Sequence, residues 1–133
     1  MGEKEPFATQ EEHSRRVIRY QDVPAIGLAP GMKAHIIAAE RMTLSMASGE
    51  PNSHLPSHHH ESEQILIVMD GAIDLVVEGK KYHIAQGDVI VLPPNIEHEG
   101  YVSDKGLSAI DIFSPPRHDF VAKLEEVKRN QKG

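Results

Sequence analysis

A cluster of histidines in the middle of this 133-residue sequence has the spacing of metal ligands. One residue separates His58 from His60, and Gln64 follows four positions after His60. If this segment is a strand, the two imidazoles share one face, because side chains alternate across a strand. His98, which follows the turn at Pro93-Pro94, is the expected fourth ligand from a distant strand. Imidazole nitrogens and an amide oxygen suit a divalent transition metal, so these four residues predict a metal site.

Other residues near this cluster leave alternatives open. Glu63 is the chief rival of Gln64 as a ligand, but it lies on the opposite face if the register is right. His59 falls between two inward positions and is expected to point away from the metal. The histidine run could instead be a solvated loop that binds no metal. The remaining histidines of this part of the chain lack this register and are expected to be surface or core residues: His35, His54 and His83.

Composition narrows the classes of partner and cofactor. Fourteen basic residues against 20 acidic ones give a net charge of -6, and no basic stripe indicates nucleic acid or an anionic membrane as a partner. Cysteine is absent, so a metal would be held by nitrogen and oxygen, which suits Zn, Ni, Fe, Mn or Co. No apolar run is long enough to span a membrane and no secretory signal is visible, so we expect a soluble, cytoplasmic protein that binds a small molecule.

Short apolar runs separated by turn residues predict an all-β sandwich or barrel. One strand is expected over 34–46, and the uninterrupted apolar run Ile65–Met69 is typical of a strand covered on both sides. A helix is expected after Asp119, with Phe120, Leu124 and Val127 on one face. We therefore divide the chain into an N-terminal arm and edge strand (1–33), a barrel (34–118), and a C-terminal helix and tail (119–133).

The N-terminal residues are polar and charged, without a sustained period. Residues 1–16 are therefore interpreted as a flexible arm, or as an edge strand that a partner subunit borrows. Val17–Tyr20 is expected to be a short strand, and a turn is expected at 103–106, before a strand over 107–113.

Two motifs resemble those of the cupin superfamily. His58-x-His60-x3-Gln64-x6-Gly71 is similar to its first motif, with Gln where Glu is usual. Gly87-x5-Pro93-x-Asn95-x2-His98 is similar to its second motif, with Asn in place of a Gly. The resemblance implies a compact single-domain cupin, which is a double-stranded β-helix or jelly-roll barrel with a metal in its mouth. It also makes a homodimer the expected assembly.

A narrower resemblance covers residues 110–120, which are similar to the end of the pectin-degradation (KdgF-like) cupins. Those proteins convert cyclic unsaturated uronates to linear keto sugars and use His, His, Gln and His as ligands. The similarity implies that Asp111, Phe113 and Arg117 line the substrate pocket as catalytic residues. Asp111 would move a proton, and Arg117 would hold a substrate carboxylate through two parallel hydrogen bonds. The alternative is that Arg117 only forms an ion pair where the barrel closes.

The amide in the ligand set bears on the type of reaction. A neutral Gln in place of a carboxylate leaves more of the ion's charge uncompensated, which favours Lewis-acid chemistry over redox chemistry. The sequence therefore predicts a metal-dependent isomerase or ring-opening enzyme that acts on a carboxylated, sugar-like molecule such as an unsaturated uronate. The alternatives are an iron- or manganese-dependent dioxygenase and a non-catalytic module that binds or senses a small molecule.

Overall fold

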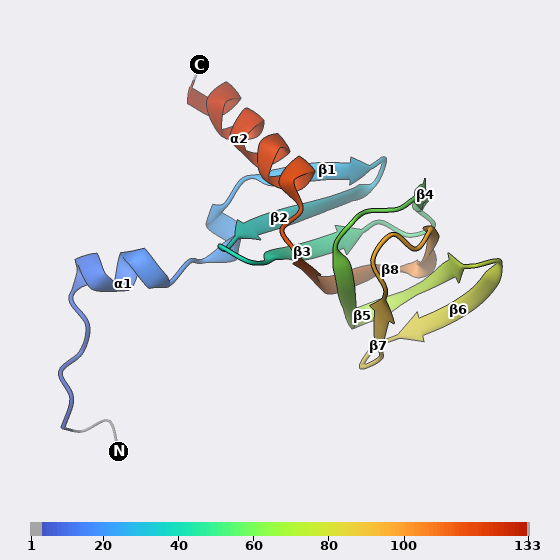
Figure 1. The fold of residues 1–133 in the computed structure, drawn as a ribbon, viewed down its shortest axis with the longest axis horizontal. Coiled ribbons are helices and arrows are strands. Elements are labelled where there is room, and N and C mark those ends of the chain that lie inside the picture. The colour runs from blue at the N-terminus through green and yellow to red at the C-terminus, as the bar shows by residue number, and fades with distance from the viewer. Residues whose placement is uncertain (1–3, 133) are drawn as a thin grey trace.

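The computed structural model describes residues 4–132 and has a jelly-roll barrel at its centre (Figure 1). No helix in the described range is both long and apolar enough to cross a membrane. The elements in chain order are the helix α1 Gln10–Arg16, the 3-10 turn η1 Tyr20–Asp22, β1 Ala25–Ala29, β2 Met32–Ala38, β3 Thr43–Gly49, β4 His54–His58, β5 Glu63–Val77, β6 Lys80–Ala85, β7 Val89–Leu92, β8 His98–Ser114, and the helix α2 His118–Lys132.

The strands form one antiparallel sheet that folds over on itself. Its order is β1-β2-β3-β8-β5-β6, with β4 paired to β8 and β7 paired to β5. The two longest strands, β5 and β8, take part in both walls of the barrel. The first half of β5 pairs with β7 and with the second half of β8, whereas its second half pairs with β6 and with the first half of β8. The predicted all-β jelly roll with a C-terminal helix is confirmed.

Two apolar clusters hold the fold together. The larger one lies inside the barrel and is made of inward side chains of β5 and β8 and their neighbours, such as Val68, Leu75 and Leu107. In the smaller one, Leu124 of α2 packs against Ile26 of β1 and Ile36 of β2. The C-terminal helix therefore covers β1 and β2, and its predicted inward residues Phe120, Leu124 and Val127 all belong to this cluster.

Two motif positions have backbone requirements that explain their residue types. Gly71 has a φ of 75°, and a Cβ atom there would lie 2.0 Å from the carbonyl oxygen of Gly106. Asn95 has a φ of 63°, in the left-handed region that Gly and Asn tolerate. Its N–H donates to the carbonyl oxygen of His60 at 2.7 Å. The turn after β7 therefore contacts the loop that carries His60.

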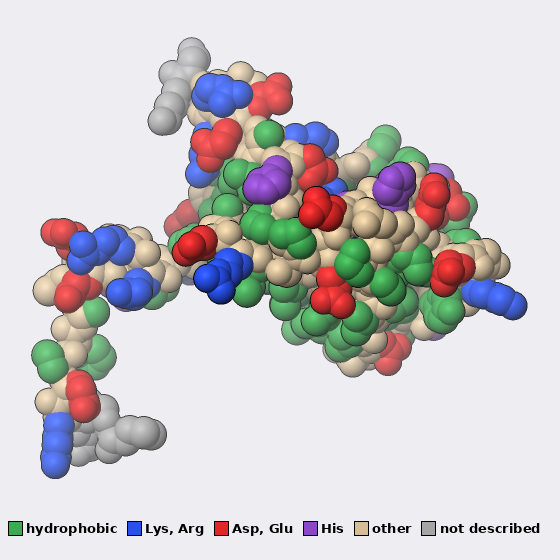
Figure 2. Space-filling view, viewed as in Figure 1, with side chains coloured by type: hydrophobic (Ala, Val, Ile, Leu, Met, Phe, Trp, Pro, Cys, Tyr) green, Lys and Arg blue, Asp and Glu red, His purple; other side chains and the backbone are tan. Residues whose placement is uncertain are grey.

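The N-terminal region differs from the prediction. Residues 10–16 form α1, which begins with a capping box between Thr9 and Glu12, a signal that is present in the sequence. The predicted strand over Val17–Tyr20 is wrong, because no strand lies between residue 4 and Ala25 and the 3-10 turn η1 begins at Tyr20. α1 has no buried residue and lies away from the barrel (Figures 1 and 2).

The strand boundaries differ in two further places. The predicted strand over 34–46 is two strands, because the chain turns at 39–42, where Ala39 N–H donates to the Met42 carbonyl oxygen at 3.0 Å. The predicted turn at 103–106 is an irregularity within β8 (His98–Ser114), where the register with β5 shifts because Gly71 pairs with Leu107 and Ile73 pairs with Val102. The division of the chain at 33/34 and 118/119 stays a prediction; β2 spans the first boundary and α2 spans the second.

Candidate metal centre

Three imidazole rings come together beside the pairing of β4 with β8. His58 ends β4, His98 begins β8, and the two are partners in the strand register. His60 lies in the loop between β4 and β5, so the prediction that it shares a strand with His58 is wrong. One ring nitrogen from each of the three histidines nevertheless lies within 4.8 Å of the other two.

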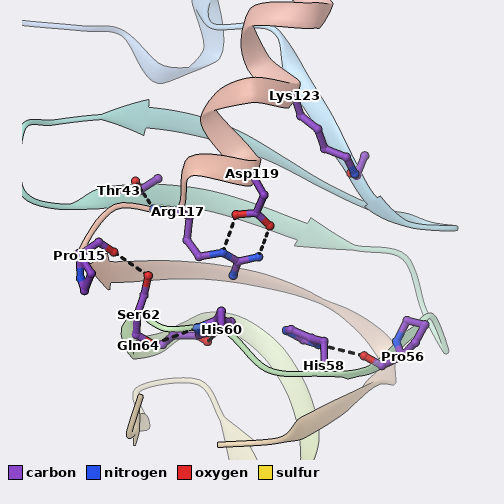
Figure 3. A network of polar contacts seen from close by, with 11 residues as sticks. Thr43, Pro56, His58, His60, Ser62, Gln64, Pro115, Arg117, Asp119 and Lys123 are labelled. Atoms are coloured by element: carbon purple, nitrogen blue, oxygen red, sulfur yellow. Dashed lines mark hydrogen bonds and ion pairs between the residues drawn. The ribbon is translucent and has the colours of Figure 1, made fainter. Parts of the chain in front are cut away.

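The loop that carries His60 is tied down at both ends. Besides the hydrogen bond from Asn95 to the His60 carbonyl oxygen, the Ser62 hydroxyl donates to the Pro115 carbonyl oxygen at 2.6 Å (Figure 3). Ser62 is 2% exposed. These two contacts fix the position of the loop. The His60 ring therefore lies beside the other two rings although His60 is not in the same strand as His58.

Backbone carbonyls determine which ring nitrogens are available. The Nδ1 atoms of His58, His60 and His98 each lie 2.9 Å from a carbonyl oxygen, of Pro56, Ser62 and Ile96 respectively. A carbonyl oxygen only accepts, so each Nδ1 donates and each Nε2 of a neutral ring has a free lone pair. Burial lowers the pKa of His98 to about 4 and also lowers the pKa of His60. The His60 and His98 rings are therefore neutral and able to act as ligands at neutral pH.

Gln64 is buried and directs its amide oxygen at this group. Its Nε2 donates to Asp111 Oδ1 at 2.9 Å, which sets the orientation of the amide. Its Oε1 lies 3.1 Å from His60 Nε2. Because Nδ1 of His60 is already the donor, two acceptor atoms face each other, an arrangement that a shared cation would stabilise. Three imidazole nitrogens and an amide oxygen therefore fit the metal that the sequence motif implies.

The rival residues lie elsewhere. Glu63 is exposed and points to the opposite side of β5 from Gln64. His59 is exposed and lines the adjacent cavity without belonging to the three-histidine group. His54 and His83 form surface pairs with Glu99 and Asp74, each at 2.6 Å.

A cavity of about 370 Å³ opens inward from the metal centre. Asp111 lines it, is 7% exposed, and has no hydrogen bond at its second oxygen, Oδ2, to any residue within 4–132. Burial raises the pKa of Asp111 to about 6, although the hydrogen bond from Gln64 and the charge of Arg117 act to lower it. Ser45 is its register partner on β3 and also lines the cavity. The Ser45 hydroxyl is fully buried and has no hydrogen-bond partner in the described part of the chain.

Arg117 immediately precedes α2 and is 8% exposed. Its Nε and Nη2 atoms donate to the two oxygens of Asp119 at 3.0 and 2.8 Å (Figure 3). The guanidinium carbon lies 4.9 Å from the ring centroid of Phe113 and 3.8 Å from that of Phe120. The ion pair considered from the sequence is therefore present, and it occupies one edge of the guanidinium. The Nη1 side has no hydrogen-bond partner among residues 4–132 and remains available to a ligand.

The Phe113 ring lies next to both His60 of the metal centre and the Arg117 guanidinium. Phe113 is 3% exposed, and its ring meets the His60 ring edge-on, with the centroids 5.4 Å apart. The structure thus brings all seven residues singled out in the sequence to one region. Several cavity residues were not predicted from the sequence, among them the polar residues Ser45, Asp119 and Lys123. For Ser45 the alternation of β3 was the available signal, whereas Asp119 was considered only as the residue that precedes the expected helix.

Comparison with known proteins identifies similar chains. H2HPP isomerase of Bacillus subtilis is 27% identical over 130 residues, covering 95% of this chain and 52% of the relative, so the chain spans about half of that protein. The pectin degradation protein KdgF of Dickeya dadantii is 29% identical over 109 residues, covering 80% of this chain and 99% of the relative.

Solved structures agree with the fold. KdgF from Halomonas sp. matches with a TM-score of 0.68 and 27% identity, over 74% of this chain and 92% of that one. An RmlC-like cupin from Shewanella frigidimarina matches with a TM-score of 0.72 and 22% identity, over 79% of this chain and 95% of that one. The family model described as "Cupin domain" matches residues 45–113, which is just over half of the sequence. The match runs from within β3 to Phe113. The chain belongs to the cupin family.

Proposed function

We propose that this cupin is a metal-dependent isomerase or ring-opening enzyme that acts on a small carboxylated molecule. The observation that carries the proposal is that one ring nitrogen from each of the three histidines and the Gln64 amide oxygen converge beside a cavity lined by Asp111 and Arg117. Relatives support the reaction class, because one is named an isomerase and another a pectin degradation protein. The resemblance to the latter makes unsaturated uronates the first substrates to test.

The proposed ligands of the metal are His58, His60, Gln64 and His98. When bound there, a divalent ion would supply Lewis-acid polarisation of a substrate oxygen. The neutral donor set suits Zn, Ni, Fe, Mn or Co.

The other residues have separate proposed roles. Asp111 takes or returns the proton that an isomerisation moves, through the oxygen that does not accept from Gln64. Arg117 receives the substrate carboxylate on its free Nη1 side, while Asp119 fixes the plane of the guanidinium. Phe113 packs against His60 and Arg117 and keeps both in position.

Metal analysis of the purified protein, together with its His98→Ala variant, tests the ligand set. We expect about one ion per chain in the wild type and a loss of stoichiometric metal in the variant. His59→Ala is the matched control, because His59 is adjacent to two proposed ligands in sequence but lies outside the three-histidine group. Stoichiometric metal in His98→Ala would contradict the proposed site.

Turnover assays separate the three functions. Conversion of an unsaturated uronate or a related carboxylate without oxygen consumption supports the isomerase. Oxygen uptake on addition of substrate would overturn the isomerase in favour of the dioxygenase. Tight binding of such ligands to the metal-loaded protein without any turnover would favour the binding module.

A further inference from the structure

The part of the cavity away from the metal centre is apolar. It is lined by side chains from both walls of the barrel, none of which carries an N–H or O–H donor. This apolar chamber comprises Met32, Ala47, Leu55, Ile73, Leu75 and Ala109.

The strand register explains why this part of the barrel is hollow. Ala47 of β3 and Ala109 of β8 are register partners, and both side chains point inward, at 7% and 3% exposure. The inward pair at this level therefore consists of two methyl groups. The next inward pair toward the metal centre is Ser45 and Asp111. On the opposite wall, Leu55 and Leu75 flank Gly100 of β8. Ala47 and Ala109 each end at a single methyl group, and both line the cavity together with Leu55 and Leu75.

The size and chemistry of this space limit what it can receive. An apolar cavity of about 150 Å³ is sufficient to hold a benzene molecule. The whole cavity is about 370 Å³, so it has room for more than the carboxylate and the reacting oxygen. A hydroxyl group placed in the apolar chamber would lose its hydrogen bonds to water and find no replacement. A hydrocarbon group would instead be stabilised by the loss of contact with water.

We infer that the substrate is a carboxylate bearing a hydrocarbon group, a branched chain or a ring, which occupies the apolar chamber. This inference rests on the proposed function, because the polar end is where the carboxylate and the reacting oxygen bind. It narrows that function in a different direction from the uronate resemblance, since the ring of a uronate carries hydroxyl groups all around. Ala47 and Ala109 then become specificity-determining residues.

Ligand binding to the zinc-loaded protein tests the inference with three probes: pyruvate, 4-methyl-2-oxopentanoate and galacturonate. The two oxo acids share one polar end and differ only in the hydrocarbon group. We expect 4-methyl-2-oxopentanoate to bind at least tenfold more tightly than pyruvate, and galacturonate to bind more weakly than 4-methyl-2-oxopentanoate. Ala109→Leu, which fills the apolar chamber, is expected to remove the tenfold preference and to leave the Kd of pyruvate within about twofold of the wild-type value. Ala47→Val provides a second, smaller filling variant in case the first fails to fold.

The outcomes separate this inference from the proposed function. Equal binding of the two oxo acids, tightest binding of galacturonate, or a preference that persists in a folded filling variant would overturn the apolar chamber as a subsite. If neither oxo acid binds, the proposed carboxylate site fails, and the neutral ketone 4-methylpentan-2-one then tests the chamber alone. It should shift the NMR signals of the Ala47 and Ala109 methyl groups, and the absence of that shift would overturn the inference.

Discussion

The inner and outer faces of β3, β8 and β5 carry different kinds of side chain at neighbouring positions. The inner face near the metal centre is polar and buried, with Ser45, Gln64 and Asp111 between 1% and 7% exposed. The outer face of the same strands and of β7 is apolar and partly exposed. Two register rows cross it without a charged residue: Leu44, Ile112, Ile65 and Val91 in one, and Met46, Ile110, Ile67 and Val89 in the other.

This polarity is the reverse of the usual pattern, in which an antiparallel sheet is apolar toward the core and polar toward water. The polar inner residues are explained by the metal centre and the cavity. The apolar outer face has no cover from any residue within 4–132, and Val89 and Val91 remain 55% and 57% exposed. Hydrophobic side chains gather in patches on the surface of the barrel (Figure 2). The homodimer expected from the sequence stays a prediction, and this face is where we expect it to form.

The largest effect is expected on the inner face, from Asp111→Asn. Asparagine retains an oxygen that can accept from Gln64 Nε2, so the metal content should not change, while the group that moves the proton is lost. We expect turnover to fall by roughly 10²- to 10⁴-fold. Metal analysis and turnover assays on the same preparation check both parts, with the exposed Asp70→Asn as a control. Turnover within about threefold of wild type would remove Asp111 from the proposed proton transfer.

The sequence motifs predicted the inner face better than the outer one. The motif spacings identify His58, His60, Gln64, Gly71 and His98. The inward direction of Asp111 follows from the alternation of side chains along its own strand. The run Ile65–Met69 was interpreted as a strand covered on both sides, but Met69 is 49% exposed in the single chain. No residue within 4–132 covers that second side fully. The pairing of Ala47 with Ala109, and hence the apolar chamber, depends on register between strands about sixty residues apart and could not be predicted from local patterns.

On the outer face, Ile67→Lys should prevent association of two chains. Ile67 lies in the middle of its register row, between Val89 and Ile110. Burying an unpaired ammonium group between two apolar sheets is unfavourable by several kcal/mol, so the dimer dissociation constant should rise by at least about 100-fold. Analytical ultracentrifugation across a concentration series measures this. Tyr82→Lys on β6 is the control, because Tyr82 is also exposed but lies on the other wall. A wild-type chain that stays monomeric at high concentration would show that this face is not a dimer interface.

A smaller effect is expected at the edge of the inner face, from Asp119→Asn. The variant weakens the two charge-assisted hydrogen bonds that orient Arg117, so we expect KM to rise by roughly tenfold with kcat nearly unchanged. Asp104→Asn, in an exposed segment of β8, should leave both parameters unchanged. A kcat that falls as much as KM rises would show that Asp119 does more than position Arg117.

The same substitution has a pH-dependent effect on stability. Hydrogen bonds from Arg117 hold the pKa of Asp119 below its usual range. A carboxylate with a lowered pKa in the folded chain stabilises the fold above its unfolded-state pKa of about 3.9, and that stabilisation is lost as the pH falls through the lowered value. The difference in unfolding free energy between wild type and Asp119→Asn should therefore be present at neutral pH and shrink in acid. A difference that does not change with pH would contradict the ion pair.

The smallest effect, and one of opposite sign, is expected from Ser45→Ala. The Ser45 hydroxyl is 1% exposed and unpartnered within the described range, so it lost its hydrogen bonds to water on folding without gaining others. Its removal should stabilise the fold by about 1 kcal/mol, measured by chemical denaturation of the ligand-free protein. Ser62→Ala is the matched control, since Ser62 is equally buried but donates to Pro115, and its removal should destabilise the fold by a similar amount. If Ser45→Ala is as destabilising as Ser62→Ala, the Ser45 hydroxyl has a hydrogen-bond partner in solution. The polar inner face then does not lower the stability of the fold.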